Sequence, residues 1–230
     1  MKVEILNDAD AVAARAAELI ASDARSAIAA RGAFTFAVSG GRTPWEMLRL
    51  LGEMEVPWHE VQLFQVDERF APTGDPDRNF THIGETLLSR AELPLNRIHA
   101  MPVEEPDLAA AVARYIASLA AVAGSPPVLD LVHLGLGPDG HTASLVPGDP
   151  VLDVVDADVA VTGVYQNRRR MTLTYPSINR ARRILWVVTG ADKAAMLERL
   201  KAGDKSIPAG RVDQARAVLL ADRAAAGHRD

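Results

Sequence analysis

The sequence predicts an α/β protein: a three-layer, doubly wound, mostly parallel sheet with helices on both faces. Apolar runs of strand length alternate with segments of 3.6-residue periodicity from end to end, which is typical of a parallel sheet buried on both sides. At 230 residues the chain is long enough to bury a sizeable core. Because no internal repeat and no linker rich in Pro, Gly or Ser divides it, we expect one domain over residues 1–230.

The predicted elements follow one another in a regular order. An Ala-rich helix follows the first strand; Asp8 or Asp10 can cap it and Gly32 ends it. Strands are expected at residues 2–7, 33–39, 61–68, 97–102, 128–136, 157–165, 169–176, 183–190 and 215–222. Helices are expected at residues 11–32, 44–54, 80–90, 106–123 and 191–203, and a polar loop at 69–79. Ligands of such sheets bind beyond the carboxyl ends of the strands, so a site is expected in the loops after residues 39, 66, 136, 174 and 190.

Composition narrows the class of function. Hydrophobic residues make up 48% and charged residues 24% of the chain, values typical of globular proteins. The formal net charge of −5 argues against a nucleic-acid partner, because binding to phosphate backbones needs concentrated Lys and Arg. No stretch approaches the length of a membrane span, and no apolar leader is visible, so we expect a cytoplasmic protein without a membrane partner. The lack of Cys excludes disulfides, thiolate nucleophiles and Cys-ligated zinc.

The segment LGLGPDGHTASLVPG, residues 134–148, raises two hypotheses. Its three glycines have the G-x-G-x-x-G spacing of a dinucleotide site, but that site needs a long helix, and the prolines that follow prevent one. His141 is the better candidate, because an imidazole with an unperturbed pKa of about 6.5 can activate water at neutral pH. Asp139, two residues earlier, can orient His141 or bind the substrate.

The remaining histidines are interpreted as structural. They are His59, His82, His99, His228 and the mid-strand His133, which we expect to be buried and hydrogen-bonded. With no Cys and no H-x-x-x-H spacing, the histidines do not form a metal site. We therefore expect no metal and no cofactor.

Other strand ends carry groups that suit an anion. In SGGRTP, residues 39–44, two glycines turn the backbone so that amide N–H groups and a helix N-terminus form a cradle. The candidate ligands in this loop are Ser39, Gly40, Gly41 and Thr43. Arg69 can pair with a phosphate while Asp67 and a neighbouring carboxylate hold it, and Arg170 and Lys193 follow at later strands. Together with His141, these groups indicate hydrolysis or isomerisation of a small phosphorylated molecule without a metal.

Five ordered segments also carry a family resemblance. They are SGGRTP, VDERF with DPDRNF, LDLVHLGLGPDGHTASLVPG, RMTLTYPSINRARRILWVVTGADKA and IPAGRV. In these segments the chain resembles the lactonase branch of the glucosamine-6-phosphate isomerase/6-phosphogluconolactonase superfamily over nearly its whole length. Two positions depart from the family pattern: Arg78 stands where Ser usually precedes Asn79, and Val146 replaces a common Phe. Neither position touches the expected chemistry.

The resemblance implies a carboxylic ester hydrolase that converts 6-phospho-D-glucono-1,5-lactone to 6-phosphogluconate in the oxidative pentose phosphate pathway. His141 would be the general base, and Asp139 would orient it or bind a sugar hydroxyl. Arg69 and Lys193 would hold the phosphate of this small-molecule partner, with Arg170 and the glycine-rich loop contributing hydrogen bonds.

Two alternatives remain from the same superfamily. The deaminase branch shares the DGH core but continues into a Glu-Pro pair that supplies a catalytic Glu, whereas this chain has Val146-Pro147, so deamination is disfavoured. Phosphosugar sensor domains resemble the family in fold and bind without turnover. Such regulators carry an N-terminal helix-turn-helix, whereas this sequence starts at its first strand.

Overall fold

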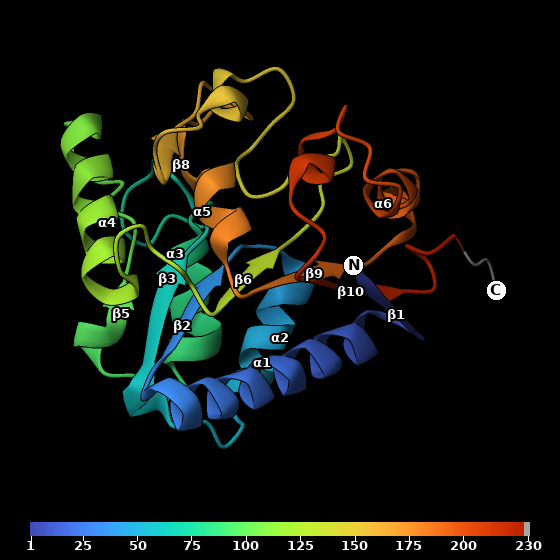
Figure 1. Cartoon of the computed structure of the whole chain (residues 1–230), viewed down its shortest axis with the longest axis horizontal. Helices are drawn as coiled ribbons and strands as arrows, with labels where there is room; N and C mark the ends of the chain where they lie inside the picture. Colours follow the sequence, from blue (N-terminus) through green and yellow to red (C-terminus); the bar gives the residue numbers. More distant parts are fainter. Residues whose placement is uncertain (228–230) are drawn as a thin grey trace.

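A computed structural model describes residues 1–227, and within them two sheets form. The main sheet has seven parallel strands in the order β1-β10-β9-β6-β2-β3-β5 (Figure 1). Its strands are β1 (Lys2–Leu6), β2 (Phe34–Val38), β3 (Val61–Gln65), β5 (Ile98–His99), β6 (Leu131–Leu134), β9 (Arg183–Val188) and β10 (Ala217–Asp222). A smaller antiparallel sheet has the order β4-β8-β7 and consists of β4 (Asp67–Arg69), β8 (Arg170–Leu173) and β7 (Val159–Val161). The predicted α/β class is confirmed.

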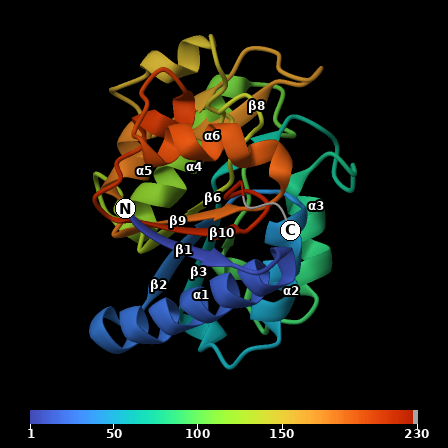
Figure 2. The ribbon, with the colours of Figure 1, turned by 90° about the vertical axis from the view of Figure 1, so that its right-hand side faces the viewer.

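Helices cover both faces of the main sheet, as Figure 2 shows. One face carries α1 (Ala9–Arg31), α2 (Arg42–Gly52) and α3 (Asn79–Ile83), and the other carries α4 (Leu108–Ala123), α5 (Tyr175–Arg180) and α6 (Ala194–Lys201). Successive residues of a strand point to opposite faces. Accordingly Phe36 of β2 packs in the core beneath α1 and α2, and the next residue, Ala37, packs in the core beneath α4.

The first helix begins at Ala9, two residues before the predicted start, and ends at Arg31, just before the predicted stop Gly32. The Asp8 carboxylate accepts the backbone N–H of Ala11 at 2.8 Å, so Asp8 rather than Asp10 is the N-cap. Gly32 follows the last turn with a left-handed φ of 77°, a conformation that costs glycine little. The helix packs against the sheet through a face rich in small Ala side chains, which lets the helix lie close to the strands.

The predicted strand 61–68 is wrong in one respect, because the chain changes sheets at Val66. The N–H of Val66 donates to Val38 O of the main sheet at 2.9 Å, whereas its carbonyl accepts the N–H of Leu173 of β8 at 2.8 Å. Periodicity cannot reveal this change, since β3 and most of β4 are equally buried. The change directs the residues after Val66 into the small sheet.

The predicted strand 169–176 also differs from expectation. β8 runs antiparallel to β4 in the small sheet, with Arg69 paired to Arg170. The beginning of this strand therefore lies at the predicted site. The loop after residue 174, expected from the sequence to contribute to the site, follows the opposite end of the strand. Arg170 reaches the site because of this reversal.

Smaller differences concern element ends. Helix α2 begins at Arg42 rather than Pro44, and the expected helix 191–203 is divided into a 3-10 turn at Ala191–Lys193 and α6. Lys193 therefore precedes α6 instead of lying in its first turn. After the G-x-G-x-x-G segment only a short 3-10 turn forms, at Pro150–Asp153. No helix within residues 1–227 has both the length and the apolar character needed to cross a bilayer.

Candidate active site

The site lies at the point where the strand order of the main sheet reverses. From β2 the sheet continues through β3 to β5, and from the neighbouring β6 it continues the other way through β9. The loops that follow β2, β6 and β9 open there onto a cavity of about 560 Å³. Nine of the ten predicted site residues line it: Ser39, Gly40, Gly41, Thr43, Asp67, Arg69, His141, Arg170 and Lys193. The tenth, Asp139, contacts His141.

His141 and Asp139 form an imidazole–carboxylate pair. The Nδ1–H of His141 donates to Asp139 Oδ1 at 2.5 Å, and the same oxygen accepts the backbone N–H of His141 at 3.1 Å. With Nδ1 as the donor, the lone pair of a neutral ring lies on Nε2, which is the state a general base needs. Partial burial alone would raise the pKa of Asp139, but the charge of His141 and the hydrogen bonds from His141 and Tyr165 hold it below its usual range.

Two glycines of the G-x-G-x-x-G segment allow the backbone conformation around His141. A Cβ at Gly137 would lie 2.0 Å from His141 Nδ1, so only glycine lets the backbone pass this close to the imidazole. Gly140 has a φ of +83° and turns the chain tightly before His141. A Cβ at Gly135 would meet open space among the described residues. The structure therefore gives Gly137 and Gly140 roles that need no dinucleotide.

Arg69 and Arg170 are paired residues of β4 and β8, and both line the cavity. Neither Arg69 nor Arg170 forms an ion pair with a carboxylate within residues 1–227, and the Nε of each is buried without a hydrogen-bond partner there. Burial, and then the nearby charge of Arg69, lowers the pKa of Arg170. Buried cations are normally paired, so two unpaired guanidinium groups on one cavity are suited to bind an anion.

Neutral and anionic neighbours hold these cations in place. Arg69 Nη1 donates to Asp77 O at 2.6 Å and to Asn79 Oδ1 at 3.0 Å. Arg170 Nη2 donates to Gln166 Oε1 at 2.9 Å. Lys193 differs from both arginines, because its Nζ lies 3.0 Å from the carboxylate of Asp192, an exposed partner that an incoming anion can replace.

The glycine-rich loop supplies the N-terminus of α2. Within the described residues no side chain caps this helix, whose first N–H groups lie at the cavity. Thr43 Oγ1 is 2.6 Å from Thr189 Oγ1, which joins this loop to the one after β9. A Cβ at Gly40 would lie 2.1 Å from Asn79 Oδ1, so glycine is required here by crowding.

Asp67 supports the walls of the cavity. It is 3% exposed, and its two carboxylate oxygens accept Ser39 Oγ at 3.1 Å and Ser144 Oγ at 2.7 Å. Asn79 Nδ2 donates to the backbone carbonyl of Asp67 at 2.9 Å. Asp67 therefore connects the loop after β2, the segment after His141 and the start of α3.

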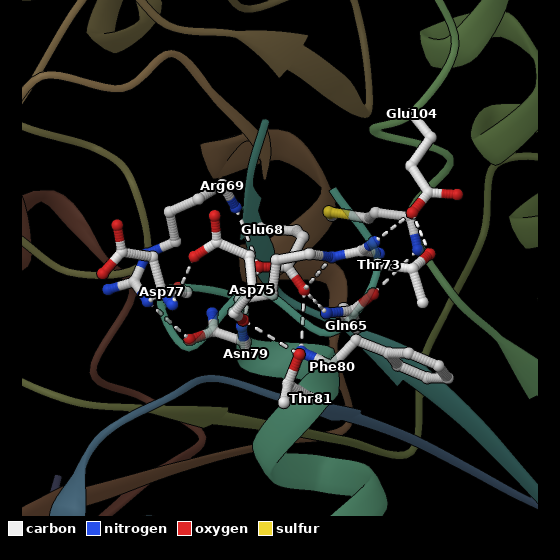
Figure 3. Close-up of polar contacts among 12 residues, drawn as sticks. Gln65, Glu68, Arg69, Thr73, Asp75, Asp77, Asn79, Phe80, Thr81 and Glu104 are labelled. Atoms are coloured by element: carbon white, nitrogen blue, oxygen red, sulfur yellow. Dashed lines mark hydrogen bonds and ion pairs between the residues drawn. The ribbon is translucent and has the colours of Figure 1, made fainter. Parts of the chain in front are cut away.

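Glu68 and Asn79 are site residues that sequence analysis missed. The fully buried carboxylate of Glu68 accepts the backbone N–H groups of Arg69, Asn79 and Phe80, each at 2.8 Å, and the side-chain amide of Gln65 at 2.7 Å (Figure 3). It thereby fixes both ends of the loop 70–78. The sequence shows Glu68 only as one charge in VDERF, and periodicity does not reveal that this charge is buried.

The other described histidines do not line the cavity. His59 is exposed, His82 Nε2 lies 2.9 Å from Pro76 O, and His99 Nε2 lies 2.7 Å from Gln62 Oε1. The buried His133 accepts the backbone N–H of Ser39 at 3.3 Å, and burial lowers its pKa to about 3.

His228 lies outside the described residues. Among residues 1–227, no three His, Asp or Glu side chains are grouped as a metal site would require.

Comparisons with known proteins concern the family and the fold of the chain. The sequence pattern of the family described as glucosamine-6-phosphate isomerases/6-phosphogluconolactonase matches residues 7–220. A 6-phosphogluconolactonase of Nostoc sp. is 37% identical over 204 residues, which is 87% of this chain and 85% of that one. The 6-phosphogluconolactonase of Mycobacterium tuberculosis is 36% identical over 238 residues, with 97% and 96% of the two chains covered.

Solved structures have the same fold. The crystal structure of a 6-phosphogluconolactonase from Thermotoga maritima matches with a TM-score of 0.85 at 26% identity and covers 96% of this chain and 98% of its own. A monomeric glucosamine-6-phosphate deaminase matches with a TM-score of 0.86 at 19% identity and full coverage of both chains. The second likeness concerns the fold alone, since the same fold can carry different reactions.

Proposed function

Because this chain belongs to the glucosamine-6-phosphate isomerase/6-phosphogluconolactonase family, we propose that it hydrolyses 6-phospho-D-glucono-1,5-lactone to 6-phospho-D-gluconate. Relatives at 36–37% identity over most of the chain carry the name of this lactonase. The observation that supports it most strongly is one cavity with a carboxylate-oriented imidazole and two arginines that have no acidic partner within residues 1–227. The imidazole is suited to activate water, and the two arginines are suited to bind a phosphate.

His141 acts as the general base. Its Nε2 takes a proton from water while the water oxygen bonds to the lactone carbonyl carbon, giving a tetrahedral oxyanion. The imidazolium then returns this proton to the ring oxygen as the carbon–oxygen ring bond breaks, and the new carboxylic acid ionises. The hydrogen bond from Nδ1 to Asp139 holds the ring orientation and stabilises the imidazolium. Acid-base assistance of this kind is worth about 10² to 10⁴ in rate.

The phosphate binds at the other end of the cavity. Arg69 and Arg170 provide guanidinium donors, Lys193 adds a third cation, and the N-terminus of α2 adds backbone N–H groups. A phosphate monoester carries about −1.5 to −2 charge at neutral pH, which two or three cations balance. Binding energy gained there fixes the position of the distant carbonyl relative to His141.

Val146 argues against a deaminase, and the pair of His141 and Asp139 argues against a sensor without turnover. Val146 stands where the deaminase pattern has Glu, and its side chain is 4% exposed and apolar, so it offers no carboxylate to open a sugar ring. A sensor without turnover has no need of a base held by a carboxylate at 2.5 Å, whereas a hydrolase does.

A coupled assay tests the proposal. The lactone is generated in situ, 6-phosphogluconate dehydrogenase is added, and NADPH formation is followed with and without the protein. We expect acceleration over the spontaneous rate, cut by about 10² or more in His141→Ala. His59→Ala is the matched control, since His59 is exposed and does not line the cavity, and it should keep full activity. Phosphosugar binding without acceleration would refute the lactonase and leave a sensor.

A further inference from the structure

A tight turn just before β8 lies against the acid-base pair. Tyr165 and Arg168 exchange backbone hydrogen bonds at 2.9 and 3.2 Å, and the two residues between them, Gln166 and Asn167, have φ values of 49° and 64°. Two successive left-handed residues define the type of turn that matches the twist of paired strands. Neither residue is glycine, so this conformation is kept at a cost, which is common where a turn places functional groups.

The Tyr165 side chain reaches the acid-base pair. Its hydroxyl donates to Asp139 Oδ2 at 3.0 Å, while the other oxygen of that carboxylate accepts Nδ1–H of His141. The edges of the two rings also meet, with centroids 5.5 Å apart and planes at 66°. The Asp139 carboxylate is thus held from both sides, and its rotation about the terminal side-chain bond is restricted.

The same ring also contacts Arg170, one of the two arginines proposed to bind the phosphate. The guanidinium carbon of Arg170 lies 4.9 Å from the centroid of Tyr165, a cation–π contact. The next residue of the turn, Gln166, accepts a hydrogen bond from the same guanidinium at 2.9 Å. One turn therefore contacts both the acid-base pair and Arg170.

We propose that Tyr165 is a positioning residue that fixes the Asp139 carboxylate toward His141 and the Arg170 guanidinium toward the substrate phosphate. The proposal rests on the lactonase function given above. Tyrosine meets both needs at once, because its hydroxyl binds the carboxylate and its ring binds the cation. Burial and the negative charge of Asp139 raise the pKa of Tyr165, so the hydroxyl keeps its proton and remains the donor at neutral pH.

Two substitutions separate the two contacts. Tyr165→Phe removes only the hydroxyl, and we expect kcat to fall about 3- to 10-fold with KM unchanged, which is the size of a typical net hydrogen bond. Tyr165→Leu also removes the ring, and we expect the same loss in kcat together with a rise in KM of about 3-fold or more. Tyr175→Phe is the matched control: its hydroxyl donates to Pro208 O at 2.9 Å, and its loss should leave both constants unchanged.

A double-mutant cycle tests whether Tyr165 acts through Asp139. If it does, Tyr165→Phe introduced into Asp139→Asn should lower kcat by less than about 2-fold, because the carboxylate it positions is already gone. An equal fold-loss in both backgrounds would overturn the proposal, as would wild-type kcat in Tyr165→Phe. A loss of thermal stability without this pattern in kcat and KM would also overturn it.

A second readout needs no turnover. The Nδ1–H proton of His141, held by Asp139 at 2.5 Å, should give a downfield NMR resonance that shifts in Tyr165→Phe and stays in Tyr175→Phe. An unchanged resonance in Tyr165→Phe would count against the positioning role whatever the reaction. If the wild type fails to hydrolyse the lactone but this resonance responds to Tyr165, the proposed function fails and the positioning role stands.

Discussion

Replacing Glu68 by Gln should damage both the stability of the protein and the binding of its substrate. The carboxylate is fully buried and accepts four N–H groups, two at each oxygen. Gln has the same shape but offers one oxygen and one NH₂ group. Whichever way the amide is turned, two of the four donors then face another donor.

The size of the effect follows from this count. A buried donor left without an acceptor costs about 1 to 3 kcal/mol, so two such donors lower the free energy of unfolding by about 2 to 6 kcal/mol. The buried guanidinium of Arg78, whose Nε lies 3.8 Å from Glu68 Oε2, also loses part of its charge compensation. Arg78 is one of the two departures from the family pattern, so this chain depends on Glu68 more than a chain with Ser there.

Activity should change through the binding of the phosphate. The ends of loop 70–78 loosen, and with them the carbonyl of Asp77 and the amide of Asn79 that orient Arg69. We expect KM to rise about 10-fold or more and kcat to change little, because the imidazole–carboxylate pair has no contact with Glu68 among its hydrogen bonds.

Urea unfolding and steady-state kinetics of the same preparations provide the measurements. Glu85→Gln is the control, since that carboxylate is 67% exposed and its one ion pair, to His82, is at the surface. It should lose less than about 0.5 kcal/mol. A Glu68→Gln protein that loses less than about 1 kcal/mol of unfolding free energy and keeps the wild-type KM would refute this account of the loop.

Two further predictions concern residues in β6 and in the loop that follows it. The Gly137→Ala protein should fold, but its kcat should be lower by about 10² or more. The reason is that the new Cβ would lie 2.0 Å from His141 Nδ1 and must displace the imidazole ring. A wild-type kcat in this variant would contradict the contact. Burial lowers the pKa of His133 to about 3 in the folded state, whereas a histidine in the unfolded chain has a pKa of about 6.5. Between these two pH values the unfolded state therefore binds one more proton than the folded state. The free energy of unfolding should therefore fall by about 1.4 kcal/mol for each pH unit below about pH 6. His133→Asn should flatten this dependence of stability on pH. An equal slope in both proteins would exclude His133 as its source.

Much of the fold and most of the cavity could be predicted from the sequence, for physical reasons. Long apolar runs and the caps Asp8 and Gly32 define the main sheet and α1, since burial and capping leave local patterns. Residues at strand ends converge because parallel strands share an edge. By contrast, Glu68 and Tyr165 act through contacts between segments distant in sequence, and neither a charge run nor an isolated aromatic residue reports such a contact.

The exchange of sheets at Val66 explains why the site combines an acid-base pair with an arginine pair. A parallel sheet alone presents loops, and here they provide the glycine-rich cradle, His141 and Lys193. Two guanidinium groups side by side repel each other, so their approach needs a rigid support. The antiparallel pairing of β4 with β8 places Arg69 directly opposite Arg170 and provides that support through backbone hydrogen bonds. The repulsion that this pairing maintains is relieved when an anion binds, so under the proposed function the small sheet favours a substrate that carries a phosphate.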